Sequence, residues 1–204
     1  DDAVEAGDTR EALASIRDSE YSSPIDKMVA ERLMKFKDLP KIAKRGDIDA
    51  SGQYDAIADE VQLKDVGIHT TLHEAVHGFL HRLIADHEAG LVKSPAIDNL
   101  RQLYNYVAKK HPEWRKTYGF KNLSEFASEA MSNATFQTAL NSVPYQQTNA
   151  FTAFVRRVMQ ALGIKPTSEH TALMESIVQV DAALEQGRQY QTERTGTRVE
   201  GKLD

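Results

Sequence analysis

The sequence has 204 residues, seven histidines, no cysteine and a formal net charge of −5. This length is typical of a single domain and is long enough to bury a hydrophobic core. The absence of cysteine excludes disulfide scaffolds, thiolate-ligated metal sites and cysteine nucleophiles, so any metal would be bound by histidine or carboxylate side chains. No apolar run approaches the ~18 residues of a transmembrane helix, which predicts a soluble chain without a membrane span.

The N-terminal quarter predicts an exposed arm, one helix and a small sheet. Residues 1–20 are acidic and polar, and we expect an N-terminal arm that is frayed or forms a short exposed helix. Ser23 and Pro24 predict the start of a helix that ends near Pro40, because serine caps helices and proline suits their first position. Glycines punctuate short alternating runs between 46 and 68, which indicates a hairpin or short strands.

The rest of the chain has helical periodicity. An apolar stripe begins after Thr70, formed by Leu72, Val76, Phe79, Leu80 and Leu83. Four further helices are expected at 95–110, 122–140, 148–162 and from about 168 to 187. Residues 188–204 carry too little apolar content to fold, and we expect a disordered tail. The sequence therefore predicts an α+β, helix-dominated domain over residues 21–187, of which 142–187 form a C-terminal helical part.

The helix from Thr70 contains the run His73-Glu74-Ala75-Val76-His77. Two histidines four residues apart project from one helix face and can bind one metal ion together. Glu74 follows the first histidine and can accept a proton from water activated by that ion. Uncharged flanking residues favour a buried metal helix, although His73 and His77 could also be ordinary, partly buried histidines.

A catalytic zinc needs a third protein ligand and leaves its fourth position to water. Two carboxylates in the predicted helix 122–140 are candidates. Glu125 lies three residues after Asn122, where a capping box would explain it without a metal. Glu129 lies beside an apolar face and would need a partner, so we predict Glu129 as the ligand and keep Glu125 as the alternative. Asn133, one turn further, is expected to accept the ring N–H of a ligand histidine.

The run HEAVH followed by SEAMSN resembles the gluzincin class of zinc metallopeptidases, in which a glutamate ligand is followed one turn later by an aspartate. This sequence has Asn133 at that position. More narrowly, HEAVH, NLSEFASEAMSNATFQTALNSVPY and FVRRVMQALGI resemble the zincin-like peptidase domains of large polyvalent phage and mobile-element proteins, over about residues 50–185. The resemblance implies a zincin-like fold with a small mixed sheet on the HExxH helix, a Zn²⁺ cofactor and a phage setting.

Zincins usually place an edge strand beside the substrate and add a residue that stabilises the oxyanion. Residues 59–63 occupy the position of that strand in the order of elements, although they could equally be a core strand. Tyr145 is the first candidate for the oxyanion residue, with His111 and Tyr118 as alternatives. His69 and His81 extend the histidine series, and we expect both outside the ligand set because a tetrahedral ion accommodates only three protein ligands beside water.

The first functional hypothesis is a zinc-dependent endopeptidase, with Glu74 as general base and a protein or peptide substrate, acting in the phage virion or the host cytoplasm. The alternative is a catalytically degenerate zincin that acts as a binding or ejection module of a phage particle. A third hypothesis is nucleic-acid binding through the basic segments 27–45 and 109–121, although solvated helix faces give the same pattern. The sequence does not indicate an oligomeric state.

Overall fold

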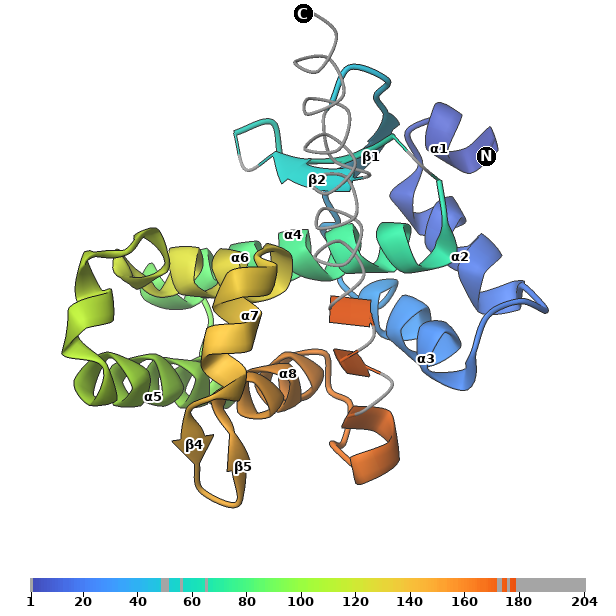
Figure 1. The fold of residues 1–204 in the computed structure, drawn as a ribbon. Coiled ribbons are helices and arrows are strands. Elements are labelled where there is room, and N and C mark those ends of the chain that lie inside the picture. Colours follow the sequence, from blue (N-terminus) through green and yellow to red (C-terminus); the bar gives the residue numbers. More distant parts are fainter. Residues whose placement is uncertain are drawn as a thin grey trace, which may run out of the picture.

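Figure 1 shows a computed structural model of the chain, which describes residues 2–48, 52–55, 57–64, 66–171, 174, 175, 177 and 178. Its elements are α1 Asp2–Glu5, α2 Thr9–Asp18, α3 Pro24–Leu33, β1 Lys41–Lys44, β2 Gly52–Asp55, β3 Glu60–Leu63, α4 Ile68–Glu88, α5 Pro95–Lys110, the 3₁₀ helices η1 Pro112–Lys116 and η2 Tyr118–Phe120, α6 Leu123–Ser132, α7 Ala134–Asn141, β4 Pro144–Tyr145, β5 Thr148–Asn149 and α8 Ala150–Ala161. Residues 168–171 and the last four described positions are also helical. This helix-rich architecture with a small mixed sheet confirms the α+β expectation.

Helix α4 lies at the centre of the molecule, between the sheet above it and the helices below it in Figure 1. It contacts β2 and β3 on one side and α3, α5 and α6 on others. Leu72, Val76 and Leu80 are fully buried along it and belong to the main hydrophobic core. The apolar stripe predicted from the sequence is thus the stripe that anchors α4. None of the described helices is long and apolar enough to cross a membrane.

The three-stranded sheet has the order β1-β3-β2, with β1 parallel and β2 antiparallel to β3. Ile42, Val61 and Leu63 are buried, whereas Gln53 and Gln62 lie on the other face and hydrogen-bond each other at 2.7 Å. The expectation that residues 59–63 form the substrate-facing edge is wrong, because β3 is hydrogen-bonded on both sides. The edge strand that contacts α4 is β2.

The N-terminal segment is more ordered than the sequence predicts. Helix α2 is capped by Asp8, whose side chain accepts from the backbone N–H of Glu11 at 2.9 Å, and it packs on α3. Leu13 and Ile16 are buried in the main core. The expectation of a frayed or exposed arm is therefore wrong over α2. The many acidic residues made the segment polar on average, although its apolar residues lie on one face of a short helix.

The predicted helix 122–140 is two helices, α6 and α7, that meet at Asn133. The side chain of Asn133 accepts from the backbone N–H of Phe136 at 3.0 Å and so caps α7. Asparagine offers the backbone this local alternative to a continuous helix, which explains the break. The expected end of the last helix near 187 and the expected tail 188–204 lie outside the residues that the structure describes.

Candidate active site

His73, Glu74 and His77 lie in the first half of α4, which is its most enclosed part. His73 is 0% exposed and Glu74 is 1% exposed, and His77 is partly buried. Strand β2 lies against Glu74 and helix α6 against His77 in this half of α4. The polar groups of the motif are therefore largely removed from bulk water, where a buried polar or charged group needs a partner.

The ring of His73 is fixed by a backbone carbonyl far along the chain. Its Nδ1 lies 3.1 Å from the carbonyl oxygen of Ile177, 104 residues later. Because a carbonyl can only accept, the neutral ring carries its proton on Nδ1 and its lone pair on Nε2. Nε2 lies 3.9 Å from Oε1 of Glu74. The nitrogen that can bind a metal is thus the one that faces the motif glutamate.

Glu74 lies between the two histidines and against β2. Its Oε2 is 3.8 Å from Nδ1 of His77. A Cβ built at Gly52 would lie 2.8 Å from Cγ of Glu74 and 2.9 Å from Cγ2 of Thr70. Gly52 therefore lets the edge strand lie directly on Glu74, which a larger residue would prevent. The sequence showed Gly52 only as punctuation of a short strand.

His77 contacts α6 and β2. Its Nε2 lies 3.2 Å from Oγ of Ser128 in α6, and its ring centroid lies 5.9 Å from that of Tyr54 in β2. Ser128, which precedes the predicted ligand Glu129 by one residue, is not among the residues expected from the sequence. A serine in mid-helix carries no local signal of its partner, because the contact depends on how α6 crosses α4.

Glu129 is partly buried in α6, and Asn133 supports it. Nδ2 of Asn133 donates to Oε2 of Glu129 at 2.8 Å, while Oδ1 of Asn133 caps α7. In the structure Asn133 accepts from the backbone of Phe136 and donates to Glu129, so it does not have the expected role as acceptor for a ligand histidine. The acceptor for the His73 ring N–H is the carbonyl of Ile177.

Glu125, the alternative ligand, lies in the first turn of α6 and interacts with His81 of α4. Asn122 accepts from the backbone N–H of Glu125 at 2.8 Å, which confirms the predicted N-cap of α6. A hydrogen bond to Glu125 raises the pKa of the Tyr118 hydroxyl. Burial lowers the pKa of His81, and nearby His77 lowers it further, whereas the Glu125 carboxylate opposes that shift. Glu125 therefore belongs to a polar group with Tyr118 and His81, one turn beyond His77.

Tyr145 does not lie with the histidines. It is buried in β4, where its ring packs edge-to-face on Tyr106 with centroids 5.0 Å apart. The β4–β5 hairpin lies below α5 and α8 in Figure 1, and α4 lies above them. The expectation that Tyr145 stabilises an oxyanion is therefore wrong, since the ring serves the packing of α5. His111 stacks on Trp114 at 4.0 Å and lies 2.9 Å from Glu113, so it too belongs to another part of the surface.

The histidine pair fits a zinc ion in its chemistry. His73 and His77 are imidazoles one helical turn apart, and Nδ1 of His73 is hydrogen-bonded to a backbone carbonyl, as the second ring nitrogen of metal-ligating histidines commonly is. Within the part of the chain that the structure describes, no three histidine, aspartate or glutamate side chains are grouped so that they could hold a metal ion. The assignment of Glu129 as third ligand therefore stays a prediction.

Comparisons with known proteins add no further information on the site. No protein-family model, curated protein or solved structure matches this chain.

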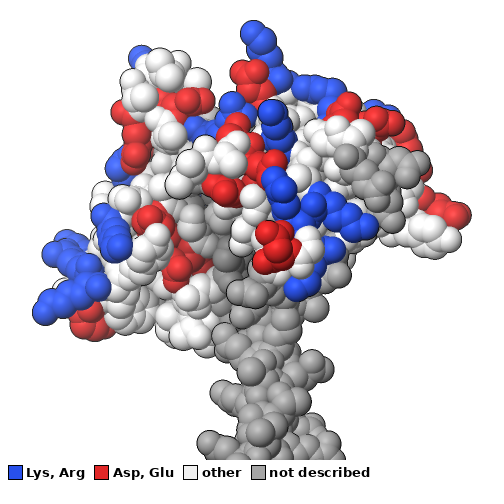
Figure 2. All heavy atoms as spheres, turned by 90° about the horizontal axis from the view of Figure 1, so that it is seen from above, with Lys and Arg blue, Asp and Glu red and all other residues white. Residues whose placement is uncertain are grey.

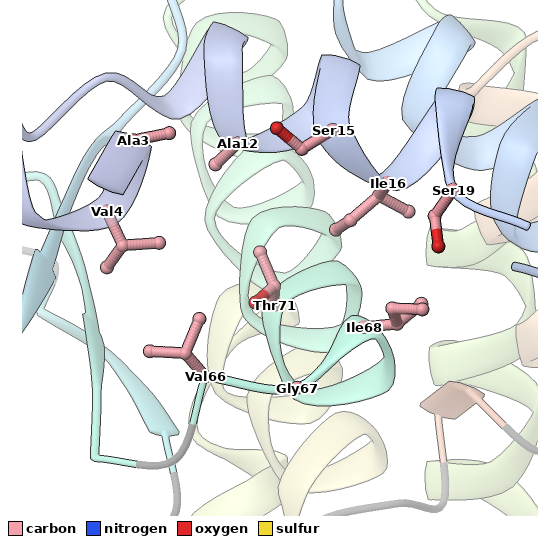
Figure 3. A pocket seen from close by; sticks show the side chains of 10 residues that line it. All are labelled: Ala3, Val4, Ala12, Ser15, Ile16, Ser19, Val66, Gly67, Ile68 and Thr71. Carbon is pink, nitrogen blue, oxygen red and sulfur yellow. The ribbon is translucent and has the colours of Figure 1, made fainter. Parts of the chain in front are cut away.

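A separate hollow of about 180 Å³ lies at the N-terminal end of α4 (Figure 3). It is enclosed by α1 and α2 on one side and by the loop before α4 on the other, with Val4, Ile16, Val66 and Ile68 among its lining residues. Ile68 and Thr71 are the α4 residues among those that line it, and the three motif residues His73, Glu74 and His77 are not among them. We assign it no chemistry.

Charged side chains of both signs alternate over the face that carries the sheet (Figure 2). Arg45, for example, pairs with Glu60 at 3.0 Å. This mixed surface favours the solvated interpretation of the basic segment 27–45. A second group of basic residues lies at the end of α5, in η1 and in the loop before α6, and its exposed members are Lys109, Lys110, Arg115, Lys116 and Lys121.

Proposed function

We propose that the chain is a zinc-dependent endopeptidase with a zincin-like fold. The observation that carries this proposal is the enclosure of Glu74 between His73 and His77, with carboxylate-to-ring distances of 3.9 and 3.8 Å, in the buried part of α4. Two imidazoles one turn apart on a helix, with a carboxylate next to the first, are the set that zinc hydrolases use to bind the metal and move a proton.

Each side chain has a defined task in this proposal. His73 and His77 hold the ion, and Glu129 completes the ligand set, with Glu125 as the alternative. Bound Zn²⁺ supplies a Lewis acid that polarises a peptide carbonyl and lowers the pKa of water. Glu74 takes the proton from the attacking water and delivers it to the leaving amine. The hydrogen bond from Asn133 orients the Glu129 carboxylate, as expected for a ligating carboxylate.

The substrate in this proposal is a protein or peptide whose backbone pairs with β2. This strand is an edge of the sheet and lies on Glu74 through Gly52. An extended peptide that added itself to β2 would form main-chain hydrogen bonds next to the proposed base. Tyr54, which follows Gly52 in β2 and contacts His77, would lie beside that peptide.

The direct test is the variant Glu74→Gln. It should bind zinc as tightly as the parent protein, because glutamine keeps the shape of the side chain, and it should cleave no protein substrate above background. Glu31→Gln is the matched control, since Glu31 lies 57% exposed on α3 in a pair with Lys35. Metal content is measured by atomic absorption and cleavage on an unfolded protein such as casein. Full cleavage by Glu74→Gln would refute the proposal.

The third ligand is tested by comparing Glu129→Gln with Glu125→Gln. The variant that loses the carboxylate ligand should bind zinc much more weakly than the parent protein. The other variant should bind zinc as the parent protein does. We expect Glu129→Gln to be the weak binder. Loss of zinc in Glu125→Gln alone would assign the ligand to the group of Tyr118 and His81 instead.

A second candidate function is a catalytically degenerate zincin that acts as a binding or ejection module of a phage particle. Two observations favour it: Asn133 stands where gluzincins have an aspartate, and Tyr145, the expected oxyanion residue, packs on Tyr106 of α5. This candidate predicts that Glu74→Gln is without effect on phage infectivity and that chelators inhibit no cleavage. The peptidase proposal predicts the opposite for both measurements.

A further inference from the structure

The last described residues of the chain pack against the helix that carries the histidines. We call Met174, Glu175, Ile177 and Val178 the C-terminal segment. Met174, Ile177 and Val178 are all 0% exposed and belong to the same core cluster as Leu72 of α4. The segment is therefore a part of the core beside the site and not an appendage to it.

The C-terminal segment selects the nitrogen that His73 offers to a metal. The carbonyl of Ile177 accepts the Nδ1 proton at 3.1 Å, in a contact that is buried. A carbonyl can only accept, so this contact favours the ring form with its proton on Nδ1, which is the form whose Nε2 lone pair can bind an ion on the side of Glu74. The backbone of residue 177 thus favours one tautomer of His73.

Two side chains hold the C-terminal segment in place. Gln137 of α7 is 4% exposed, and its Nε2 lies 3.4 Å from the carbonyl of Val178 and 3.0 Å from that of Ala130. Thr152 of α8 donates from Oγ1 to Oε1 of Glu175 at 2.7 Å. The segment is therefore clamped to two different helices, on either side of the residue that contacts His73.

We propose that docking of the C-terminal segment positions His73, and that Gln137 and Thr152 are positioning residues that act through the carbonyl of Ile177. The docked segment holds the ring as the Nδ1–H tautomer and so raises the affinity of the site for a divalent metal. The effect on affinity rests on the proposed zinc function, whereas the tautomer is a property of the metal-free protein. The site is thus coupled to the C-terminal segment as defined above.

The test uses the full chain with Gln137→Leu and Thr152→Val. Thr138→Val is the matched control, because Thr138 is an exposed threonine on α7. Three quantities are measured: the His73 tautomer from ring ¹⁵N chemical shifts of metal-free protein, the exchange rate of the amide protons in the C-terminal segment, and the Kd for Zn²⁺ from competition with a chelating dye. We expect the parent and the control to hold the Nδ1–H tautomer.

In Gln137→Leu and in Thr152→Val, the amide protons of the C-terminal segment should exchange faster and His73 should populate the Nε2–H tautomer. Both variants should bind zinc about 10- to 100-fold more weakly, which is the range typical for loss of a hydrogen bond to a ligand histidine. The proposal is overturned if the parent holds His73 as the Nε2–H tautomer, or if the segment loosens while the tautomer is unchanged. If Gln137→Leu does not fold, Thr152→Val decides, since Thr152 is only partly buried. Failure of the parent to bind zinc would refute the proposed function alone, and the tautomer would still decide this inference.

Discussion

Replacement of Gly52 by alanine should separate the edge strand from the proposed base. The added Cβ would lie 2.8 Å from Cγ of Glu74, 2.9 Å from Cγ2 of Thr70 and 3.2 Å from Cδ2 of Leu63. Carbon atoms in favourable contact are about 3.5–4.0 Å apart, so the methyl group overlaps three side chains at once. Because Glu74 is enclosed by two histidines, relief requires a shift of β2 or of the carboxylate by roughly 0.7 Å.

The size of the effect follows from this overlap. Overpacking of a core by one methyl group costs about 1–3 kcal/mol, which for a chain of this length lowers Tm by about 2–12 °C. A misplacement of about 1 Å in a catalytic group can reduce the rate by about 10²-fold. We therefore expect Gly52→Ala to reduce peptide cleavage by roughly 10- to 100-fold while the protein remains folded at room temperature.

Gly46→Ala is the matched control, because a Cβ at Gly46 meets nothing within 4 Å. It should leave Tm and cleavage unchanged or raise Tm slightly, since alanine restricts the unfolded chain. Thermal unfolding followed by circular dichroism and the rate of casein cleavage are compared for the two variants. Equal Tm and equal activity of Gly52→Ala and Gly46→Ala would refute the close approach of β2 to Glu74.

Three further predictions address neighbouring residues. Asn133→Ala should lower the free energy of unfolding in urea by about 1 kcal/mol because α7 loses its cap, whereas Asn133→Ser, which keeps an oxygen for the cap, should lose less. Tyr145→Phe should leave the cleavage rate unchanged, and a tenfold loss would restore an oxyanion role for its hydroxyl. Burial lowers the pKa of His81 below its ordinary 6.5, so its contribution to stability is present above about pH 6.5 and declines as the pH falls towards the lowered pKa. His81→Phe should remove that slope of Tm against pH, and an unchanged slope would contradict the assignment.

Local signals in the sequence predicted the elements, and long-range contacts decided the site. The cap and proline at Ser23-Pro24 and the apolar stripe of α4 are local, and the structure has both. The break at Asn133 also has a local cause. An asparagine among regularly spaced apolar residues can either continue a helix or cap the next one, and the spacing of the apolar residues does not distinguish these two outcomes. The apolar stripe of α2 was concealed by the acidic residues around it.

The groups that support the motif could not have been found from the sequence. Ser128 and Ile177 reach His77 and His73 across 51 and 104 residues, and Ile177 does so through its backbone, which has no residue-type signature. Strand order has the same limitation, because the order β1-β3-β2 puts β2 at the edge although β3 precedes α4 in the chain. Only the motif itself, with its fixed helical spacing, carries its geometry in the sequence.

The stability of a Glu74→Gln variant distinguishes a functional site from a pair of ordinary core histidines. A carboxyl group at 1% exposure loses its hydration, and the neighbouring positions Leu72 and Val76 show that this part of α4 accepts apolar side chains. A carboxyl group kept there for function should be neutral or unfavourable for stability, so Glu74→Gln should leave Tm unchanged or raise it while it abolishes cleavage. A carboxyl group that served the fold by bonding the two rings would behave differently, and its replacement would lower the free energy of unfolding by more than about 2 kcal/mol. Chemical denaturation of Glu74→Gln beside Glu31→Gln distinguishes the two, and a large loss of stability in the former would favour the structural interpretation.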